Sequence, residues 1–337
     1  MDFKVKEDIL LYYLYWMKER MDIWWRRYED NPLKVVKTKE LFDSSVQKIW
    51  TEDKLLSKYK FTNVYRCLDR VSQYLLKEVI YNGKTYSKED MLFRILIFKI
   101  FNKIETFEYL QKEYGEIVIE TFNFDEWSKY LSNSPFPIWG NAYIMNAVSY
   151  PNTKIKHEKF FYSIQDYIFK KDYIHKIIDS KSLKEVYNIL RLIPMWGDFI
   201  AYQYSIDLNY SEVINFGEND FVKVGLGAQR FIDKAFVFDK KQKEIYEDIV
   251  KWIADNIDSL REKYSNKFNK NLFFKALPGR KPTLIDYQNC CCESDKYTRG
   301  LGLNVGTSVE GKRIKCNFVE NSNKIDYIFP PKWGKVL

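Results

Sequence analysis

A tight turn between two helices is encoded by Leu192-Ile193-Pro194-Met195-Trp196-Gly197. Apolar spacing predicts one helix over about 181–192 and another over about 198–208, so the six residues join a helical hairpin. A helix that begins directly after a glycine presents unpaired N–H groups and the positive end of its dipole, and both suit a phosphate oxygen. An ordinary packed hairpin would give the same pattern, so this stretch alone leaves both interpretations open.

Apolar residues recur at helical spacing along most of the chain. Besides the hairpin, this spacing predicts helices over about 8–29, 65–80, 88–113, 157–171 and 240–264. Two helix starts carry capping patterns, because Ser87 is followed by Asp90 and Thr283 by Asp286. The residues after 300 hold scattered glycines and a Pro-Pro pair, which predicts an irregular or partly β tail. The sequence therefore predicts an all-α fold.

The composition indicates a folded, basic protein. Of its 337 residues, 46% are hydrophobic and 30% are charged, which excludes a disordered chain and a membrane-embedded one. The formal net charge of +8 favours a polyanionic partner, because lysine and arginine release counterions from a phosphate backbone. The aromatic fraction of 18% is compatible with an AT-rich genome, and we expect most of these rings in the core.

Cysteine and histidine usage predicts a reducing compartment and no metal site. The chain has five cysteines, three of them consecutive at 290–292, which do not form a disulfide framework. With only His157 and His175 and no CxxC pair, we expect neither zinc nor an iron–sulfur cluster, and no cofactor. Residues 1–8 are too charged for a secretory leader, and no apolar run is long enough to span a membrane. We therefore expect a soluble cytoplasmic protein.

A second informative segment, residues 216–230, lies beyond the hairpin and holds Asp220. Asp220 is a candidate catalytic carboxylate, and the simpler alternative is that it caps the helix that follows it. Gly225 and Gly227 permit close approach of the backbone to a ligand, but without a βαβ context they are no dinucleotide-binding motif. Asp207, at the end of the hairpin's second helix, is a rival candidate, although an aspartate at a helix end is usually only solvated.

Several segments together carry a resemblance to one known family. In chain order they are residues 60–71 (KFTNVYRCLDRV), 93–94 (FR), 101–106 (FNKIET), 199–203 (FIAYQ), 207–210 (DLNY), 218–221 (ENDF), 283–284 (TL) and 292–297 (CESDKY). With these segments the chain resembles the α-glutamyl/putrescinyl thymine pyrophosphorylases, together with the homologous helical domain of 5-hydroxymethyluracil DNA kinases. The N-terminal helix and the residues after 300 lie outside the matching motifs.

The resemblance implies a two-lobed helical bundle of the helix-hairpin-helix DNA glycosylase type with a short irregular C-terminal tail. It divides the chain into an N-terminal helical extension at 1–59, a glycosylase-like helical domain at 60–299 with the hairpin at 192–199, and a tail at 300–337. In such glycosylases a catalytic aspartate stands at a comparable distance beyond the hairpin, and Asp220 fits that position.

The hairpin also departs from the family in two places. Met195 stands where relatives have the first glycine of a P-G-x-G turn, which puts the phosphate contact in question. Phe199 stands where glycosylases that also cut the backbone have a lysine, so a lyase reaction through a Schiff base is disfavoured.

The resemblance further implies a reaction on DNA. A flipped, 5-substituted uracil would exchange pyrophosphate on its 5-methylene carbon for an amine or amino acid. The implied partners are double-stranded DNA, a small amine or amino-acid donor and a separate 5-hydroxymethyluracil DNA kinase. The kinase would be separate because the P-loop pattern GxxxxGK[ST] is not found in this sequence.

The family segments supply candidate residues for this reaction. Asp220 or Asp295 could deprotonate the amine, and Asn63 could read the pyrimidine edge. The candidates for binding the leaving pyrophosphate are Arg66, Arg70, Arg94 and Lys103. Those for stacking on the flipped base or otherwise binding it are Tyr65, Tyr143, Trp196, Tyr202 and Gln203. Those for the DNA phosphate are Trp196 and Gly197.

Each assignment has a structural alternative. Arg66 and Arg70, four positions apart, would share a helix face, where Asp69 could pair with one of them instead. The aromatic candidates could belong to the core, and residues 293–297 could form an ion-pair cluster.

Three functions stay open at this point. The first is an enzyme of thymine hypermodification that acts on DNA. The second is a monofunctional glycosylase that excises a modified pyrimidine, with Asp220 stabilising an oxocarbenium-like transition state. The third is a non-catalytic DNA-binding relative with an emptied pocket, which Met195 makes conceivable.

Overall fold

The computed structural model describes residues 3–37, 46–140, 150, 153–242, 244–303, 314, 316–319 and 325–337. This part of the chain is mainly helical, so the predicted all-α class is confirmed, and it also holds short strands that the sequence did not predict. By its internal contacts the chain forms two compact units. Unit 1 comprises Met1–Asp69, Val224–Lys324 and Gly334–Leu337, and unit 2 comprises Arg70–Lys223 and Ile325–Trp333.

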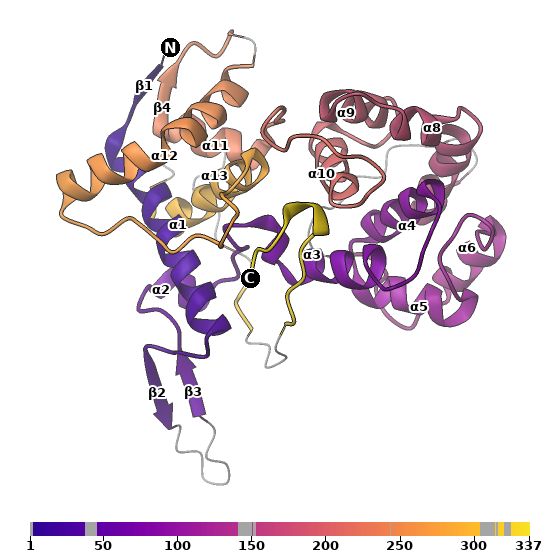
Figure 1. Cartoon of the computed structure of the whole chain (residues 1–337), viewed down its shortest axis with the longest axis horizontal. Helices are drawn as coiled ribbons and strands as arrows, with labels where there is room; N and C mark the ends of the chain where they lie inside the picture. The colour runs from indigo at the N-terminus through magenta and orange to yellow at the C-terminus, as the bar shows by residue number, and fades with distance from the viewer. Residues whose placement is uncertain are drawn as a thin grey trace. The chain divides into compact units, whose positions relative to one another are not determined.

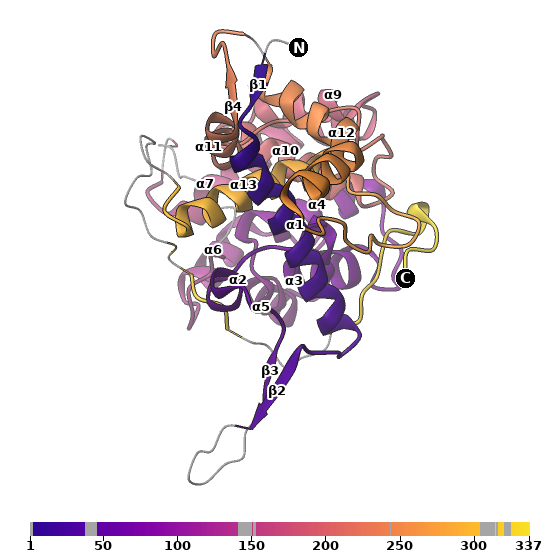
Figure 2. The ribbon, with the colours of Figure 1, turned by 90° about the vertical axis from the view of Figure 1, so that its left-hand side faces the viewer.

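Unit 1 is built around α13. Its elements are β1 (Phe3–Val5), α1 (Glu7–Tyr28), β2 (Lys34–Lys37), β3 (Val46–Ile49), α2 (Lys54–Lys58), a 3-10 helix (Arg66–Leu68), α11 (Leu226–Ala235), β4 (Phe236–Phe238), α12 (Ile245–Phe268) and α13 (Leu284–Gly300). The predicted cap of α13 is confirmed, because Thr283 and Asp286 form a capping box. Helices α1, α11 and α12 pack against α13 (Figures 1 and 2). The N-terminal helix is therefore part of the core of unit 1, and the contact units do not follow the predicted boundaries at 59 and 299.

The strands of unit 1 form two small antiparallel ladders. β1 pairs with β4, with Phe3 opposite Phe238, and thereby joins the start of the chain to the segment after α11. β2 and β3 form a hairpin, with Lys34 opposite Ile49, that projects away from the helices of the unit (Figures 1 and 2). The next helix, α2, is fixed by Asp53, whose carboxylate caps its first turn and accepts a hydrogen bond from the Tyr297 hydroxyl (2.6 Å).

Unit 2 is built around α4, whose residues 92–101 are all buried. Its elements are α3 (Arg70–Tyr74), a π-helix (Leu75–Ile80), α4 (Lys88–Phe101), α5 (Ile104–Tyr114), α6 (Phe124–Ser132), α7 (Lys156–Ser163), a π-helix (Ile164–Phe169), α8 (Tyr173–Ile178), α9 (Leu183–Arg191), α10 (Asp198–Asn209) and a 3-10 helix (Pro331–Trp333). The cap predicted for α4 is confirmed, since Ser87 Oγ accepts the N–H of Asp90 at 3.0 Å. Helices α5, α8 and α10 pack against α4, which explains why its apolar residues face every direction.

The helix predicted over 88–113 is interrupted, which corrects the prediction. Asn102 takes φ 45° and ψ 42°, a left-handed conformation that asparagine tolerates better than most residues, and it ends α4. Gly140 approaches this corner closely: its N–H donates to the carbonyl of Phe101 at 2.8 Å, and a Cβ there would lie 2.3 Å from the carbonyl oxygen of Asn102. The chain therefore starts a second helix, α5, in a new direction.

The helix predicted over 65–80 is confirmed from Arg70 to Ile80, as α3 and the π-helix that follows it, but its start is wrong. Asp69 is extended, with φ −71° and ψ 141°, and separates the 3-10 helix Arg66–Leu68 from α3. Its carboxylate accepts hydrogen bonds from the backbone N–H and the side-chain amide of Asn63, at 2.9 and 3.1 Å, which compete with a helical conformation. Arg66 and Arg70 consequently do not share a helix face.

Among the described helices, none combines the length and the apolar character needed to cross a bilayer.

Candidate functional site

The predicted helical hairpin is present in unit 2, where α9 and α10 pack against each other on either side of residues 192–197. Met195 adopts φ 75°, in the left-handed region that favours glycine, at the position where the resembled family has glycine. Trp196 is fully buried, with its ring 4.9 Å from that of Tyr204, whereas Gly197 is the exposed N-cap of α10. Of the two residues predicted for the DNA phosphate, Gly197 is the one at the surface.

The first turn of α10 already holds a carboxylate. Asp198 accepts hydrogen bonds from the Tyr187 hydroxyl, at 2.9 Å, and from Nε of Arg191, whose Nη1 also donates to the carbonyl of Trp196 at 3.2 Å. Burial alone would raise the pKa of Asp198. The hydrogen bonds from Tyr187 and Arg191 outweigh this effect, so the pKa lies below its usual value. A phosphate bound here would therefore approach a negatively charged neighbour.

Asp220 lies in an exposed turn of unit 2. Its carboxylate folds back over Gly217, where a Cβ would come within 2.4 Å of Oδ2. The next residue, Phe221, fixes this turn to the hairpin: its ring lies 5.0 Å from that of Tyr187 on α9 and 5.7 Å from that of Tyr202 on α10. The hydroxyl of Tyr202 also donates to the Phe221 carbonyl at 3.4 Å. The structure thus holds an accessible carboxylate next to residues anchored on both hairpin helices.

The other predicted contacts on α10 and its neighbour α4 are buried. Tyr202, Gln203 and Arg94 have no exposed surface. The guanidinium of Arg94 donates to Glu116 at 3.1 Å and to the carbonyl of Val79 at 3.2 Å, and it lies 4.2 Å from the centre of the Tyr86 ring. Burial lowers the pKa of Arg94. In this position Arg94 has no surface to offer a pyrophosphate group.

Asp207, the rival carboxylate, is not solvated as expected. It is fully buried in α10 and pairs with Lys99 of α4, with 3.2 Å between Oδ2 and Nζ. Lys99 also donates to the side chain of Asn102 at 2.7 Å. A buried pair of this kind holds α4 and α10 together and disfavours a catalytic role for Asp207.

The remaining cationic candidates of unit 2 are more accessible. Arg70 is exposed in the first turn of α3. Lys103 is half-buried at the start of α5, where its ammonium donates to the carbonyl of Pro137 and lies 4.7 Å from the centre of the Phe136 ring. Tyr143, a stacking candidate, lies outside the described residues.

In unit 1, residues 60–69 of the family segment are docked along α13. The N–H of Arg66 donates to Asp286 at 2.7 Å, and the N–H of Thr62 donates to Glu293 at 3.0 Å. Tyr65 is fully buried, and its hydroxyl donates to the carbonyl of Arg280 at 2.9 Å. Arg66 and Tyr65 are therefore core residues of unit 1, and the sequence blocks 60–71 and 292–297 meet in space.

Asn63 and Asp69 form a small polar cluster in this segment. The side-chain amide of Asn63 donates to the carbonyl of Leu68 at 3.0 Å and to Asp69 at 3.1 Å, and Asn63 itself is buried. Burial raises the pKa of Asp69 to about 6, although the backbone N–H of Asn63 and the charge of Arg20 oppose the shift. The raised pKa of Asp69 follows from its burial, which residue spacing alone could not reveal.

Asp295 lies in the interior of unit 1 among three cations. It is 1% exposed, and its carboxylate pairs with Lys234 (2.7 Å), Arg230 (3.2 Å) and Arg299 (3.4 Å). Burial lowers the pKa of Lys234, while its hydrogen bond to Asp295 opposes that shift. These ion pairs correspond to the structural alternative considered for residues 293–297.

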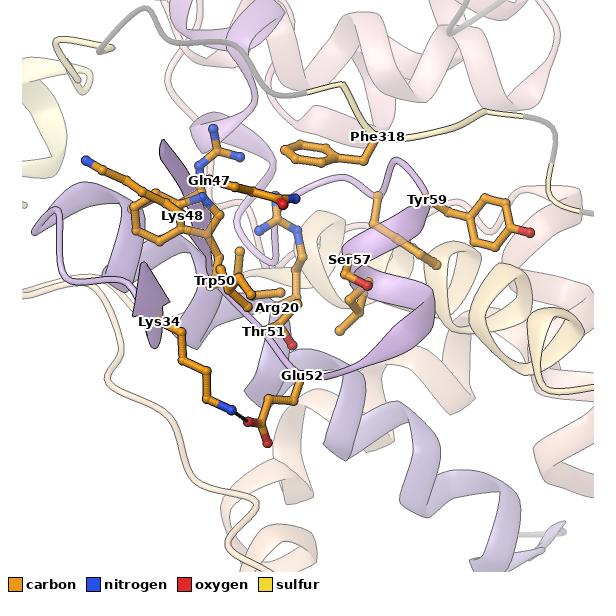
Figure 3. A pocket seen from close by; sticks show the side chains of 15 residues that line it. Arg20, Lys34, Gln47, Lys48, Trp50, Thr51, Glu52, Ser57, Tyr59 and Phe318 are labelled. Carbon is orange, nitrogen blue, oxygen red and sulfur yellow. Dashed lines mark hydrogen bonds and ion pairs between the residues drawn. The ribbon is translucent and has the colours of Figure 1, made fainter. Parts of the chain in front are cut away.

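A cavity of about 540 Å³ lies in unit 1 beside the family segment. Its lining includes Arg20 and Arg27 of α1, Lys48 of β3 and the adjoining Trp50. Figure 3 shows Arg20, Lys48 and Trp50 around it. Phe318 reaches it from the C-terminal part of the chain, which pairs with the end of α2: Phe318 N–H donates to the carbonyl of Lys58 at 2.9 Å. Sequence patterns do not indicate this cavity, because its residues lie far apart in the chain.

Within the described ranges, no group of three or more His, Cys, Asp or Glu side chains is arranged to hold a metal ion.

Comparison with known proteins relates most of the chain to one family. Residues 7–304 match the family described as the helical domain of 5-hmdU DNA kinase. The 5-hmdU DNA kinase of Bacillus phage SP10 is 26% identical over 342 aligned residues, which cover 93% of this chain and 48% of the relative. The chain therefore spans about half the length of this curated relative. No solved structure has significant similarity to the chain.

Proposed function

The chain belongs to the family of the helical domain of 5-hmdU DNA kinase, and we propose that it is an enzyme of thymine hypermodification that acts on DNA. The observation that carries this proposal is the family match over residues 7–304, which includes both the segment 60–71 and the hairpin with Asp220. The related kinase acts, by its name, on a modified uracil in DNA.

The reaction that we propose replaces pyrophosphate on the 5-methylene carbon of a flipped uracil with an amine or amino acid. The amine nitrogen forms a bond to the methylene carbon while the carbon–oxygen bond to pyrophosphate breaks. Pyrophosphate leaves with the bonding electron pair, and a carboxylate accepts the proton that the nitrogen loses. We expect a 5-hydroxymethyluracil DNA kinase activity to supply the activated base.

Asp220 is the proposed base. Its exposure in the turn next to the hairpin supports this role, since an incoming amine could reach it. Asp295 is a weaker candidate for the base. A proton from the amine would have to compete with Lys234, Arg230 and Arg299 for the oxygens of its carboxylate.

The residues that we propose to contact DNA are those exposed to solvent or only half-buried. Arg70 and Lys103 are the candidates for binding the leaving pyrophosphate, because they are less buried than Arg66 and Arg94. Gly197 is the candidate for the DNA phosphate at the hairpin. For Arg94, Tyr202 and Gln203, burial supports a positioning role within unit 2, and the burial of Arg66 supports a structural role within unit 1.

Excision of a modified pyrimidine is the alternative proposal. An exposed aspartate after a helical hairpin also suits a monofunctional glycosylase of the helix-hairpin-helix type, in which Asp220 would stabilise positive charge on the sugar. The left-handed Met195 at the turn keeps a third proposal open, that of a DNA-binding relative without catalysis.

One experiment separates the three. Duplex DNA that contains 5-pyrophosphoryloxymethyluracil is incubated with the chain and a panel of amines and amino acids, then digested and analysed by nucleoside mass spectrometry. The leading proposal predicts a new nucleoside and release of pyrophosphate. Strand cleavage on heating in alkali would instead indicate abasic sites and excision. Salt-dependent binding with unchanged nucleosides would indicate the non-catalytic function.

A further inference from the structure

We infer that the cavity in unit 1 binds a phosphorylated nucleotide, either as one unit of a DNA strand or as a free monophosphate. Its base would stack on the aromatic walls and its phosphate would bind the guanidinium groups. All residues that line the cavity belong to unit 1, whereas Asp220 belongs to unit 2. The inference therefore does not depend on the reaction proposed above.

The charge of the lining favours an anion. Its described residues include four cationic side chains, Arg20, Arg27, Lys34 and Lys48, and one acidic side chain, Glu52. Glu52 pairs with Lys34 at 2.9 Å, an ion pair drawn in Figure 3, and Lys48 pairs with Asp30 at 2.5 Å. Four cationic side chains therefore face two carboxylates, and the excess positive charge is that of Arg20 and Arg27. The neighbouring acids of α1 are also neutralised, since Arg26 pairs with both Glu19 (3.3 Å) and Asp22 (3.5 Å). Positive charge therefore prevails in the cavity.

Aromatic rings hold these cations in place. The guanidinium carbon of Arg27 lies 5.2 Å from the centre of the Phe318 ring and 5.8 Å from that of Trp50. The ammonium of Lys48 lies 5.8 Å from the centre of Trp50, whose carbonyl accepts a hydrogen bond from Arg26 at 2.9 Å. Rings next to guanidinium groups are the combination that nucleic-acid sites use, with one part for the base and the other for the phosphate.

The size and surroundings of the cavity fit this ligand. A volume of about 540 Å³ lies within the ~300–1,000 Å³ typical of small-molecule sites. An acidic peptide would use the cations but not the flat rings, so the rings favour a nucleotide. Arg20 Nε also donates to the carbonyl of Thr62 at 2.9 Å, which ties the cavity to the family segment 60–71.

The test measures binding of defined probes to the full chain. Fluorescence anisotropy follows a labelled oligothymidylate, and calorimetry follows dTMP, thymidine and inorganic phosphate. The informative variants are Arg27→Gln and Phe318→Ala. Matched controls are Lys281→Gln, a cation of unit 1 with 88% of its side chain exposed, and Phe273→Ala, an exposed ring of the same unit. Circular dichroism verifies that each variant is folded.

We expect Arg27→Gln and Phe318→Ala each to weaken binding roughly tenfold, as for the loss of a charged hydrogen bond or of one stacked base, and the controls to leave it unchanged. Dependence of dTMP binding on both residues would identify a free nucleotide as a ligand, and dependence of the oligothymidylate alone would identify a unit of DNA. The inference is overturned if neither probe depends on these residues, if the controls weaken binding equally, or if inorganic phosphate binds as tightly as dTMP.

Discussion

The turn around Asp220 and the last turns of α13 around Asp295 each hold an aspartate from a family segment, in opposite surroundings. Asp220 is exposed, and no ion pair to its carboxylate occurs within the described residues. Asp295 is 1% exposed and pairs with Lys234, Arg230 and Arg299. Membership of a family segment therefore does not by itself make an aspartate catalytic. A carboxylate paired with three buried or half-buried cations stabilises the fold. An exposed carboxylate can exchange protons with a ligand.

The largest effect is expected for Asp295→Ala. This change leaves Lys234 buried without its carboxylate, so the free energy of unfolding should fall by about 3–5 kcal/mol. Asp220→Ala, the matched change at an exposed site, should stay within about 0.5 kcal/mol of the wild type. Urea unfolding of both variants measures the contrast. Equal stability of the two would break the comparison.

Asp69 provides a third case. It is partly removed from solvent, and burial raises its pKa instead of ion pairs stabilising its charge. Its folded-state pKa of about 6 lies above the usual 3.8, so between these values the folded state binds more protons than the unfolded state. Relative to Asp69→Asn, the wild type should therefore lose stability as the pH rises from about 4 to about 6. The loss is at most about 3 kcal/mol, since one pKa unit is about 1.4 kcal/mol and solvent screening reduces it. Unfolding measured across this range tests the sign, and a gain in stability would contradict the raised pKa.

A smaller effect is expected at the hairpin turn that precedes Asp220. Met195→Gly should stabilise the chain by up to about 1 kcal/mol, because a left-handed conformation costs a non-glycine residue about 1–2 kcal/mol, partly offset by the greater freedom of glycine in the unfolded chain. Met195→Ala keeps a Cβ at φ 75° and should give no gain. Thermal unfolding compares the two variants. A loss of stability in Met195→Gly would mean that packing of the methionine side chain outweighs the backbone strain.

The smallest expected effect concerns DNA binding at the hairpin. Asp198→Asn removes the negative charge from the first turn of α10 and should raise the affinity for duplex DNA by about two- to fivefold at low salt. Asp125→Asn, the same change in the first turn of α6, serves as the control. Anisotropy titrations at two salt concentrations measure the difference. An unchanged affinity in Asp198→Asn would remove the hairpin from the proposed DNA contact.

Much of the helical framework could be predicted from the sequence, because periodicity and capping act locally. The spacing of apolar residues placed α1, α10 and α12, and the caps at Ser87 and Thr283 are present in the structure. The breaks at Asp69 and Asn102 were missed. They depend on a side-chain hydrogen bond and on a left-handed residue, and neither leaves a periodic signal.

The candidate site was less accessible to prediction, because burial and ion pairing depend on partners that are distant in the chain. Arg94 pairs with Glu116, and Asp207 pairs with Lys99, within unit 2. The sequence around Arg94 or Asp207 does not indicate these partners. The cavity of unit 1 combines Arg27, Trp50 and Phe318, and no single segment carries its pattern. The motifs indicated which segments matter, and the fold decides which of their side chains reach a ligand.

We propose above all that the exposed carboxylate of Asp220 accepts the proton of the incoming amine. The most direct test of this claim compares the wild type with Asp220→Asn on DNA that contains 5-pyrophosphoryloxymethyluracil, with the rate of nucleoside formation measured by mass spectrometry at equal DNA occupancy. Loss of a general base predicts a rate lower by roughly 10²–10⁴-fold with DNA affinity unchanged. Equal rates for the two proteins would contradict the claim, as would the absence of any new nucleoside with the wild type across the donor panel.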